Sequence, residues 1–109
     1  MEAKRLIEAT CPECRGPLSE VVENGVLEYR CLVLHRYSPI ALLDAHSDTE
    51  ERALWAAVLA LEEAAVIARE VAAQLPASSN VLLEQGAEKQ RQAKKIRGVL
   101  EDLKPFTID

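Results

Sequence analysis

The spacing of cysteine and histidine constrains this chain more than any other feature. All three cysteines and one of the two histidines lie between Cys11 and His35, in the pattern C-x2-C-x16-C-x3-H. A tetrahedral ion needs ligands from two chain segments, each bent around the metal as a knuckle, and this spacing is typical of zinc sites. A segment of ~35–40 residues buries too little surface to fold unaided, and bound metal supplies the missing stability. We therefore expect Cys11, Cys14 and Cys31 to bind structural Zn²⁺ in an N-terminal zinc ribbon, residues 1–37.

The fourth ligand is open between two histidines. His35 suits the second knuckle, whereas His46 lies at the end of a predicted short helix, where a solvent-exposed or capping role is favoured. A Cys3His set fills a tetrahedral site and leaves no position for a substrate water, so we expect a structural metal and no enzyme activity. A redox Cys-x-x-Cys lacks the surrounding βαβ pattern, and c-type haem attachment would need histidine where Arg15 stands.

The residues between the two ligand pairs predict a β-hairpin. Asn24-Gly25 is the strongest short signal for a two-residue turn. This turn gives the pairs Glu23–Val26, Val22–Leu27, Glu20–Tyr29 and Leu18–Cys31. Cys31 then falls on the apolar face, where the first knuckle can meet it, while Val21 falls unexplained on the polar face. In the first knuckle, Gly16 is expected to supply a positive φ.

After Tyr37 the pattern becomes helical. Aromatic residues are only 4% of the chain although hydrophobic residues are 49%, and Ala, Leu and Val suit closely packed helices. Ser38 and Pro39 predict the start of a short helix over 38–46, and a capping-box pattern at Ser47 and Glu50 predicts a second helix over 48–75. After the turn "PASSN", a third helix is expected over 80–104. The fold class is thus α+β and mostly α, with residues 38–109 forming a helical domain whose two long helices are an antiparallel hairpin packed as one unit.

The middle helix is apolar on more than one side. One line of residues, here called the seam, recurs at alternating intervals of four and three, the spacing of a helix that packs against another helix. It consists of Leu54, Val58, Leu61, Ala65, Ala68, Ala72 and Leu75. A second line carries Trp55, Leu59 and Val66, and a third carries Ala57, Ala60, Ala64, Ile67 and Val71. The last helix has one narrow stripe, interrupted by Gly86 and Lys89, and covers only one side. We therefore expect an interaction surface at Leu54, Trp55, Val58, Leu59 and Val66, bound by a protein partner or by a second copy in a homodimer.

Charge argues against several partners. The formal net charge is −5, which gives no strong case for nucleic acid or an anionic membrane. The basic run Lys89–Arg97 lacks interleaved aromatic residues, and pairing with the acidic middle helix explains it. A nucleic-acid-binding zinc ribbon that uses this run is the alternative function.

No apolar run approaches the ~20 residues of a membrane span, and the N-terminus lacks a secretory signal. We expect a reducing cytoplasm, where an odd cysteine count argues against disulfides.

A longer stretch resembles a known bacterial segment. "CPECRGPLSEVVENGVLEYRCLVLHRYS" followed by "ALWAAVLALEEAAVIARE" is similar to the zinc-ribbon and helical-hairpin region associated with CheB-type chemotaxis methylesterases. The resemblance covers about residues 11–103, favours His35 over His46 as ligand, and implies a setting in bacterial chemotaxis or two-component signalling. It does not imply esterase activity, because the catalytic α/β domain is missing. Leu34 stands where that pattern has glycine, and a positive φ there would add ~1 kcal/mol of strain and bears on metal affinity.

Overall fold

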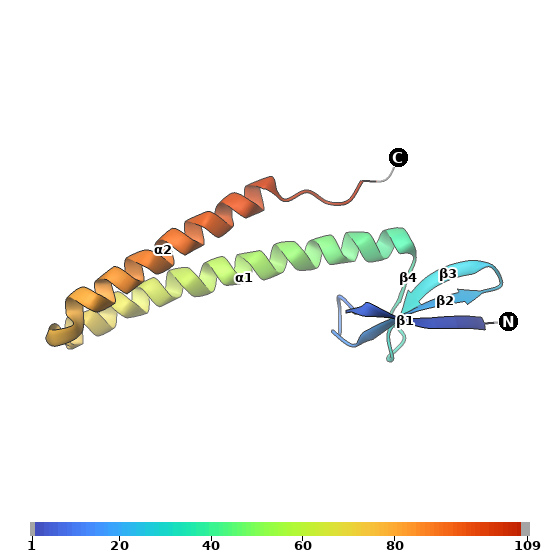
Figure 1. Cartoon of the computed structure of the whole chain (residues 1–109), viewed down its shortest axis with the longest axis horizontal. Helices are drawn as coiled ribbons and strands as arrows, with labels where there is room; N and C mark the ends of the chain where they lie inside the picture. Colours follow the sequence, from blue (N-terminus) through green and yellow to red (C-terminus); the bar gives the residue numbers. More distant parts are fainter. Residues whose placement is uncertain (1, 108–109) are drawn as a thin grey trace. The chain divides into compact units, whose positions relative to one another are not determined.

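The computed structural model describes residues 2–107 and is α+β and mostly helical. A four-stranded antiparallel sheet is followed by two helices (Figure 1). The elements are β1 (Glu2–Thr10), β2 (Pro17–Glu23), β3 (Val26–Arg30), β4 (Arg36–Tyr37), α1 (Pro39–Gln74), a 3₁₀ turn (Pro76–Ser78) and α2 (Ser79–Asp102). Within residues 2–107, no helix is both long and apolar enough to cross a membrane.

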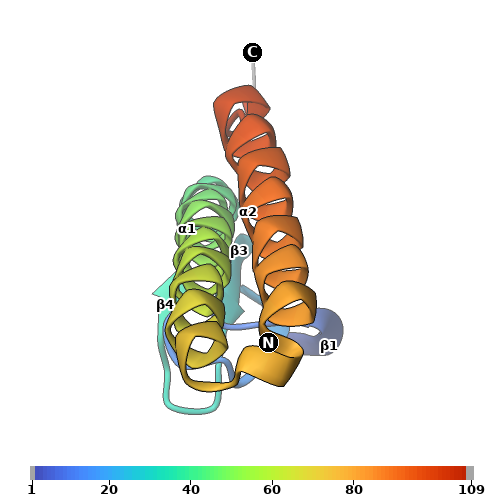
Figure 2. The same ribbon diagram turned by 90° about the vertical axis from the view of Figure 1, so that its left-hand side faces the viewer.

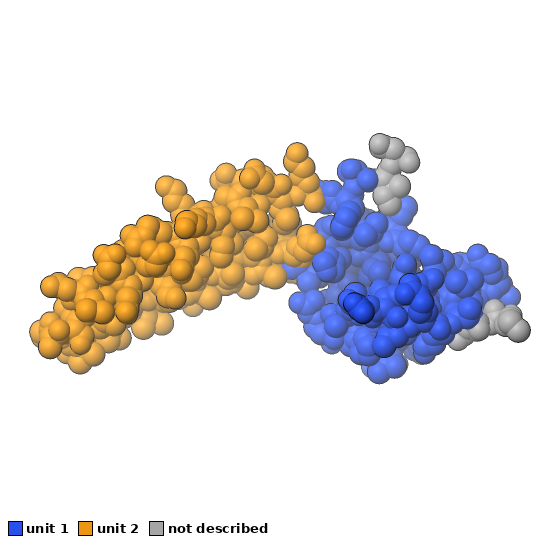
Figure 3. Space-filling view, in the orientation of Figure 1, with its two compact units in different colours: residues 1–49, 105–109 blue, residues 50–104 orange. Residues whose placement is uncertain are grey.

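The chain divides into two compact units (Figure 3). The first, here called the sheet unit, comprises residues 1–49 and 105–109; the second, the helical unit, comprises residues 50–104. The division falls within α1, later than the domain boundary expected after residue 37. The first turns of α1 therefore belong with the sheet.

The turn between β2 and β3 forms as the sequence predicts. Asn24 and Gly25 have φ of 52° and 77°, the two positive values that a type I′ turn requires. The predicted register is also observed, with Val22 opposite Leu27 and Glu20 opposite Tyr29. The hairpin thus brings the end of β3, which leads into Cys31, beside the start of β2.

Strand β1 was not predicted, and it explains the burial of Val21. The strand order is β1-β2-β3-β4, so β2 has a neighbour on both sides. Val21 lies between Lys4 and Glu28 in register and is only 2% exposed. On the same face, Lys4, Val21 and Arg30 line one pocket, so side chains of β1 and β3 flank the valine.

The core of the sheet unit contains two of the predicted ligands. Cys11, Leu18, Cys31 and Tyr37 are all buried and form one cluster. Ile7, Tyr29, Leu42 and Ala45 pack against it. The first turns of α1 therefore cover the same core as the strands.

A single helix replaces the two predicted over 38–46 and 48–75. α1 runs from Pro39 to Gln74 without a break. Its start is as expected, since the Ala41 amide donates to Ser38 Oγ at 3.1 Å. The predicted break at Ser47 was wrong because no glycine or proline interrupts the helix there, and the Thr49 hydroxyl donates to the Ala45 carbonyl one turn earlier, as side chains inside a helix do.

In the helical unit, α2 runs antiparallel beside the second part of α1 (Figure 2). Most members of the predicted seam are buried or half-buried, and Val58, Ala65 and Ala72 are among the most buried residues of the chain. Gly86 was interpreted as an interruption of the α2 stripe, and that interpretation was wrong. Gly86 is buried, and a Cβ on it would lie 3.1 Å from Ala68 Cβ, so it marks a close approach of the two helices.

Candidate metal centre

The first knuckle lies between β1 and β2 and carries two cysteines. The Cys11 amide donates to the Gly16 carbonyl at 2.7 Å, and the Arg15 amide donates to the Cys11 carbonyl at 2.8 Å. The Gly16 amide points to Cys14 Sγ at 3.4 Å. Arg15, not Gly16, has the positive φ, at 64°. Gly16 instead leaves space, because a Cβ there would lie 3.4 Å from Cys14 Sγ.

The second knuckle lies between β3 and β4 and has a related hydrogen-bond pattern. The Cys31 amide donates to the His35 carbonyl at 3.2 Å, and the Leu34 amide donates to the Cys31 carbonyl at 3.1 Å. The His35 amide points to Cys31 Sγ at 3.3 Å. Leu34 has φ of 67°, in the left-handed region that favours glycine.

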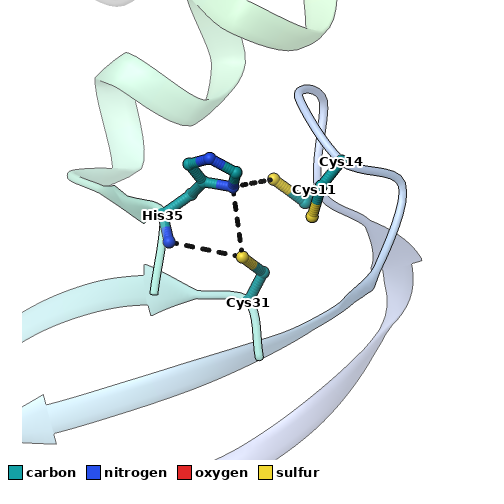
Figure 4. A group of neighbouring side chains, drawn as sticks. All are labelled: Cys11, Cys14, Cys31 and His35. Atoms are coloured by element: carbon teal, nitrogen blue, oxygen red, sulfur yellow. Dashed lines mark hydrogen bonds between the residues drawn. The ribbon is translucent and has the colours of Figure 1, made fainter. Parts of the chain in front are cut away.

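The two knuckles bring four potential ligands together (Figure 4). The ligand atoms of Cys11, Cys14, Cys31 and His35 all lie within 4.8 Å of one another. His35 Nδ1 is 3.5 Å from Cys11 Sγ and 3.3 Å from Cys31 Sγ. A tetrahedral zinc ion with Zn–S of ~2.3 Å and Zn–N of ~2.0–2.1 Å separates S and N by about 3.5 Å. The cluster is therefore close enough to hold a metal ion, and its donor set suits zinc.

The alternative ligand, His46, lies elsewhere. It lines a mainly apolar pocket with Leu42, Leu43 and Phe106, and it is not part of the four-residue cluster. The structure thus places His35, rather than His46, beside the cysteines.

Two residues outside the predicted ligand set contact it. His35 Nε2, on the far side of the ring from the sulfurs, lies 3.0 Å from a carboxylate oxygen of Glu13. The buried Tyr37 hydroxyl lies 3.5 Å from Cys11 Sγ. A carboxylate on the outer nitrogen fixes the ring so that Nδ1 presents its lone pair inward. Sequence reasoning missed both residues, although Glu13 lies inside the first knuckle and Tyr37 directly follows the second.

The surroundings favour ionised thiols at the two buried cysteines. Burial opposes ionisation, but hydrogen bonds from Tyr37 and the knuckle backbone outweigh it and lower the pKa of Cys11 to about 6. At Cys31, burial is likewise outweighed by hydrogen bonds that include the His35 amide, so its pKa is lowered. Burial and the bond to Cys11 raise the pKa of Tyr37, which therefore remains a donor. Since metals bind the thiolate, these contacts prepare the site for a cation.

At the third thiol and the imidazole, the surroundings shift the pKa upward and so favour the protonated form. The Gly16 amide acts to lower the pKa of Cys14, but burial and the neighbouring thiols outweigh it, so this pKa is raised. The hydrogen bond with Cys31 raises the pKa of His35 against the effect of burial. Metal binding requires a thiolate and a neutral imidazole, so it would act against both shifts.

The residues of the expected interaction surface separate into two groups. Val58 is only 1% exposed and belongs to the interior of the helical unit, and Leu54 is half-buried. Trp55, Leu59 and Val66 remain 46%, 57% and 46% exposed. The second group is therefore the more accessible to a partner.

Part of the basic run is paired within the chain. Arg97 binds the Glu62 carboxylate on α1 at 3.0 Å, and its guanidinium lies 5.3 Å from the centre of the Trp55 ring. Arg91 pairs with Glu88 and Glu84 on its own helix. The Arg97–Glu62 pair is of the kind expected between the basic run and the acidic middle helix, whereas Arg91 pairs along α2 itself.

Comparison with known proteins adds no relative. No family model, curated protein or solved structure matches the chain. The resemblance to the CheB-associated segment therefore stays a prediction.

Proposed function

We propose that this chain is a non-catalytic zinc-binding module that docks onto protein through its helical unit. The proposal of zinc binding rests on one observation: three Sγ atoms and one Nδ1 atom lie within 4.8 Å of one another. Zinc is the metal of choice because thiolate and imidazole donors at tetrahedral spacing match its preferences. Four protein ligands complete the coordination, so the ion would hold the fold and bind no substrate.

The buried core supports a structural role for the ion. Cys11 and Cys31 are two of the four buried residues that form the core cluster of the sheet unit. Tyr37, a third member, contacts Cys11 through its hydroxyl. Metal binding would thus join β1, β2 and β3 at the same point where they bury their apolar residues.

The docking half of the proposal rests on exposed apolar surface. Nine large hydrophobic side chains of the helical unit are at least 37% exposed: Trp55, Leu59, Val66, Ile67, Val71, Leu75, Val81, Leu83 and Val99. Trp55, Leu59 and Val66 share one side of α1, and contiguous exposed apolar surface marks an interaction site. By the resemblance of its sequence, the setting would be bacterial chemotaxis or two-component signalling.

Metal analysis of protein expressed with sufficient zinc tests the metal half. We expect about one Zn²⁺ per chain, and Cys31→Ser should lower the zinc affinity strongly. Ser47→Ala, a change outside the knuckles, serves as the control. Less than ~0.2 equivalents of zinc in the wild type would contradict the proposal.

The nucleic-acid alternative has its own test. It would be favoured by salt-dependent binding of DNA or RNA that is lost in the double variant Lys94→Ala/Lys95→Ala.

A further inference from the structure

One face of α1 in the helical unit carries no charged residue. It consists of Ala53, Ala57, Ala60, Ala64, Ile67 and Val71 of α1 together with Leu75, which directly follows the end of the helix, and is here called the alanine–aliphatic face. Successive residues are about 100° apart on a helix, and Ala57, Ala64 and Val71 each precede a buried seam residue by one position. The face therefore lies beside the contact with α2. Ile67, Val71 and Leu75 on it are 60%, 37% and 51% exposed.

The face is a better docking surface than the side of α1 that carries Trp55. The Arg97 guanidinium lies over the Trp55 ring and is held there by Glu62. A partner on that side would have to displace or desolvate this ion pair, which costs free energy. No such group occupies the seven positions of the alanine–aliphatic face.

Residue size along the face indicates what covers it. The first four positions are alanine, and the last three are isoleucine, valine and leucine. About a two-fold axis at Ala64, antiparallel pairing places position 64−n of one copy opposite position 64+n of the other. Ala57 then meets Val71 of the second copy, and Ala53 meets Leu75. A parallel arrangement would set large residues against large and small against small, leaving gaps between the helices.

We propose that a second copy of this chain docks antiparallel on the alanine–aliphatic face, with the two α1 helices crossing near Ala64. Val71 of one copy then fills the space above Ala57 of the other, and Leu75 that above Ala53, as close packing requires, whereas Ile67 meets Leu61 at the edge of the face. The contact is isologous, so one self-complementary patch serves both copies. It also covers exposed apolar residues that a helical unit of 55 residues leaves bare. This inference deepens the docking half of the proposed function and does not depend on the metal.

The first test is the mass of the zinc-loaded full chain at tens of micromolar, measured by analytical ultracentrifugation. We expect a dimer, twice the 12.0 kDa of one chain. Ala64→Glu sets two like charges at the axis and should weaken the dimer at least ~100-fold. Ala73→Glu is the matched control, because Ala73 is exposed, lies nine residues further along α1 and faces the opposite side. Circular dichroism checks that both variants stay helical.

A size exchange tests the antiparallel register. Val71→Ala alone removes two methyl groups at each of two symmetric contacts and should weaken the dimer at least ~10-fold. Ala57→Val combined with Val71→Ala exchanges the pair across the axis and should restore most of the affinity. Helical variants in which the exchange does not restore binding would overturn the register.

Further outcomes of these measurements would overturn the proposed face or the zinc site. A monomeric wild type, or equal dissociation by Ala64→Glu and Ala73→Glu, would overturn the proposed face. Zinc measured on the same samples separates the two proposals. A monomer with full zinc contradicts only this inference, whereas a dimer without zinc contradicts only the metal half of the proposed function.

Discussion

At Leu34, the backbone conformation and the residue type disagree. Its φ of 67° brings the Cβ of an L-residue too close to its own backbone, which glycine avoids. The side chain is 65% exposed, so it gains little burial in return. The second knuckle nevertheless needs this conformation, because it lets the Leu34 amide reach the Cys31 carbonyl and the His35 amide face Cys31 Sγ.

We expect Leu34→Gly to leave the zinc-loaded protein about 1 kcal/mol more stable than the Val33→Gly variant, because both changes add the flexibility of glycine but only the first relieves strain. The substitution relieves the strain in the folded state and removes an exposed aliphatic side chain. Urea unfolding of the metal-loaded protein measures the change. Val33→Gly is the control, because Val33 is equally exposed but lacks a positive φ; it should destabilise by up to about 1 kcal/mol. Equal losses in both variants would show that Leu34 is not strained.

Glu13 is expected to tune metal affinity without touching the metal. Its carboxylate oxygen lies 3.0 Å from His35 Nε2 and so favours the ring orientation in which Nδ1 faces the sulfurs. Glu13→Gln removes the charge and should weaken zinc binding about 10-fold, the low end for such contacts because the Glu13 side chain is 58% exposed. Competition with a chromophoric chelator measures the affinity. Glu8→Gln removes an exposed carboxylate of the same unit and should change little; equal losses would point to net charge instead.

The residues of the candidate site differ in how far the sequence could predict them. Cys11, Cys14, Cys31 and His35 follow from spacing, because ligand chemistry restricts which intervals can surround one ion. The positive φ of the first knuckle could not be assigned to Arg15, because Gly16 stands next to it and glycine is the residue that usually adopts a positive φ. Glu13 and Tyr37 act through the orientation of their side chains, and spacing carries no information on that.

Among the elements, the sequence predicted best where one signal dominated. The Asn24-Gly25 turn set the β2–β3 register, and Ser38-Pro39 set the start of α1. Strand β1 was missed because "EAKRLIEAT" lacks clear alternation of apolar and polar residues. It is an edge strand whose Leu6 is 66% exposed, and pairing with β2 rather than a buried face defines it. The break expected at Ser47 shows that a capping-box pattern does not end a helix when the backbone can continue through it.

The two glycines of α2 should respond to substitution in opposite directions. Gly86 faces Ala68 at close approach, so Gly86→Leu must push the helices apart and should cost about 1–3 kcal/mol. A Cβ on Gly98 would meet no neighbouring side chain within 4 Å, so Gly98→Ala should stabilise by about 0.5–1 kcal/mol through helix propensity. Thermal unfolding followed by helical circular dichroism compares the two. A gain in both variants would mean that Gly86 does not set the helix separation.

At the scale of the whole molecule, the two units draw their stability from different sources. The buried core of the sheet unit is built from Leu18 and Tyr37 together with Cys11 and Cys31. Removing a metal from those cysteines would leave ionisable thiols without their cation in the core of a small sheet. The helical unit buries a seam of its own along α1 and α2, including Val58, Ala65 and Ala93. No predicted ligand belongs to that seam.

Metal removal should therefore unfold one unit and spare the other. Structural zinc contributes on the order of 10–16 kcal/mol of apparent binding free energy, more than a core of this size can replace. After chelation, backbone amides of β1–β4 and of residues 39–49 should lose protection from hydrogen exchange, while those of residues 50–104 should keep it. Cys31→Ser should reproduce this pattern without a chelator, and re-addition of zinc should reverse it only in the wild type. Loss of protection along all of α1 and α2 would show that the chain folds as one cooperative unit, and the division within α1 would then have no thermodynamic meaning.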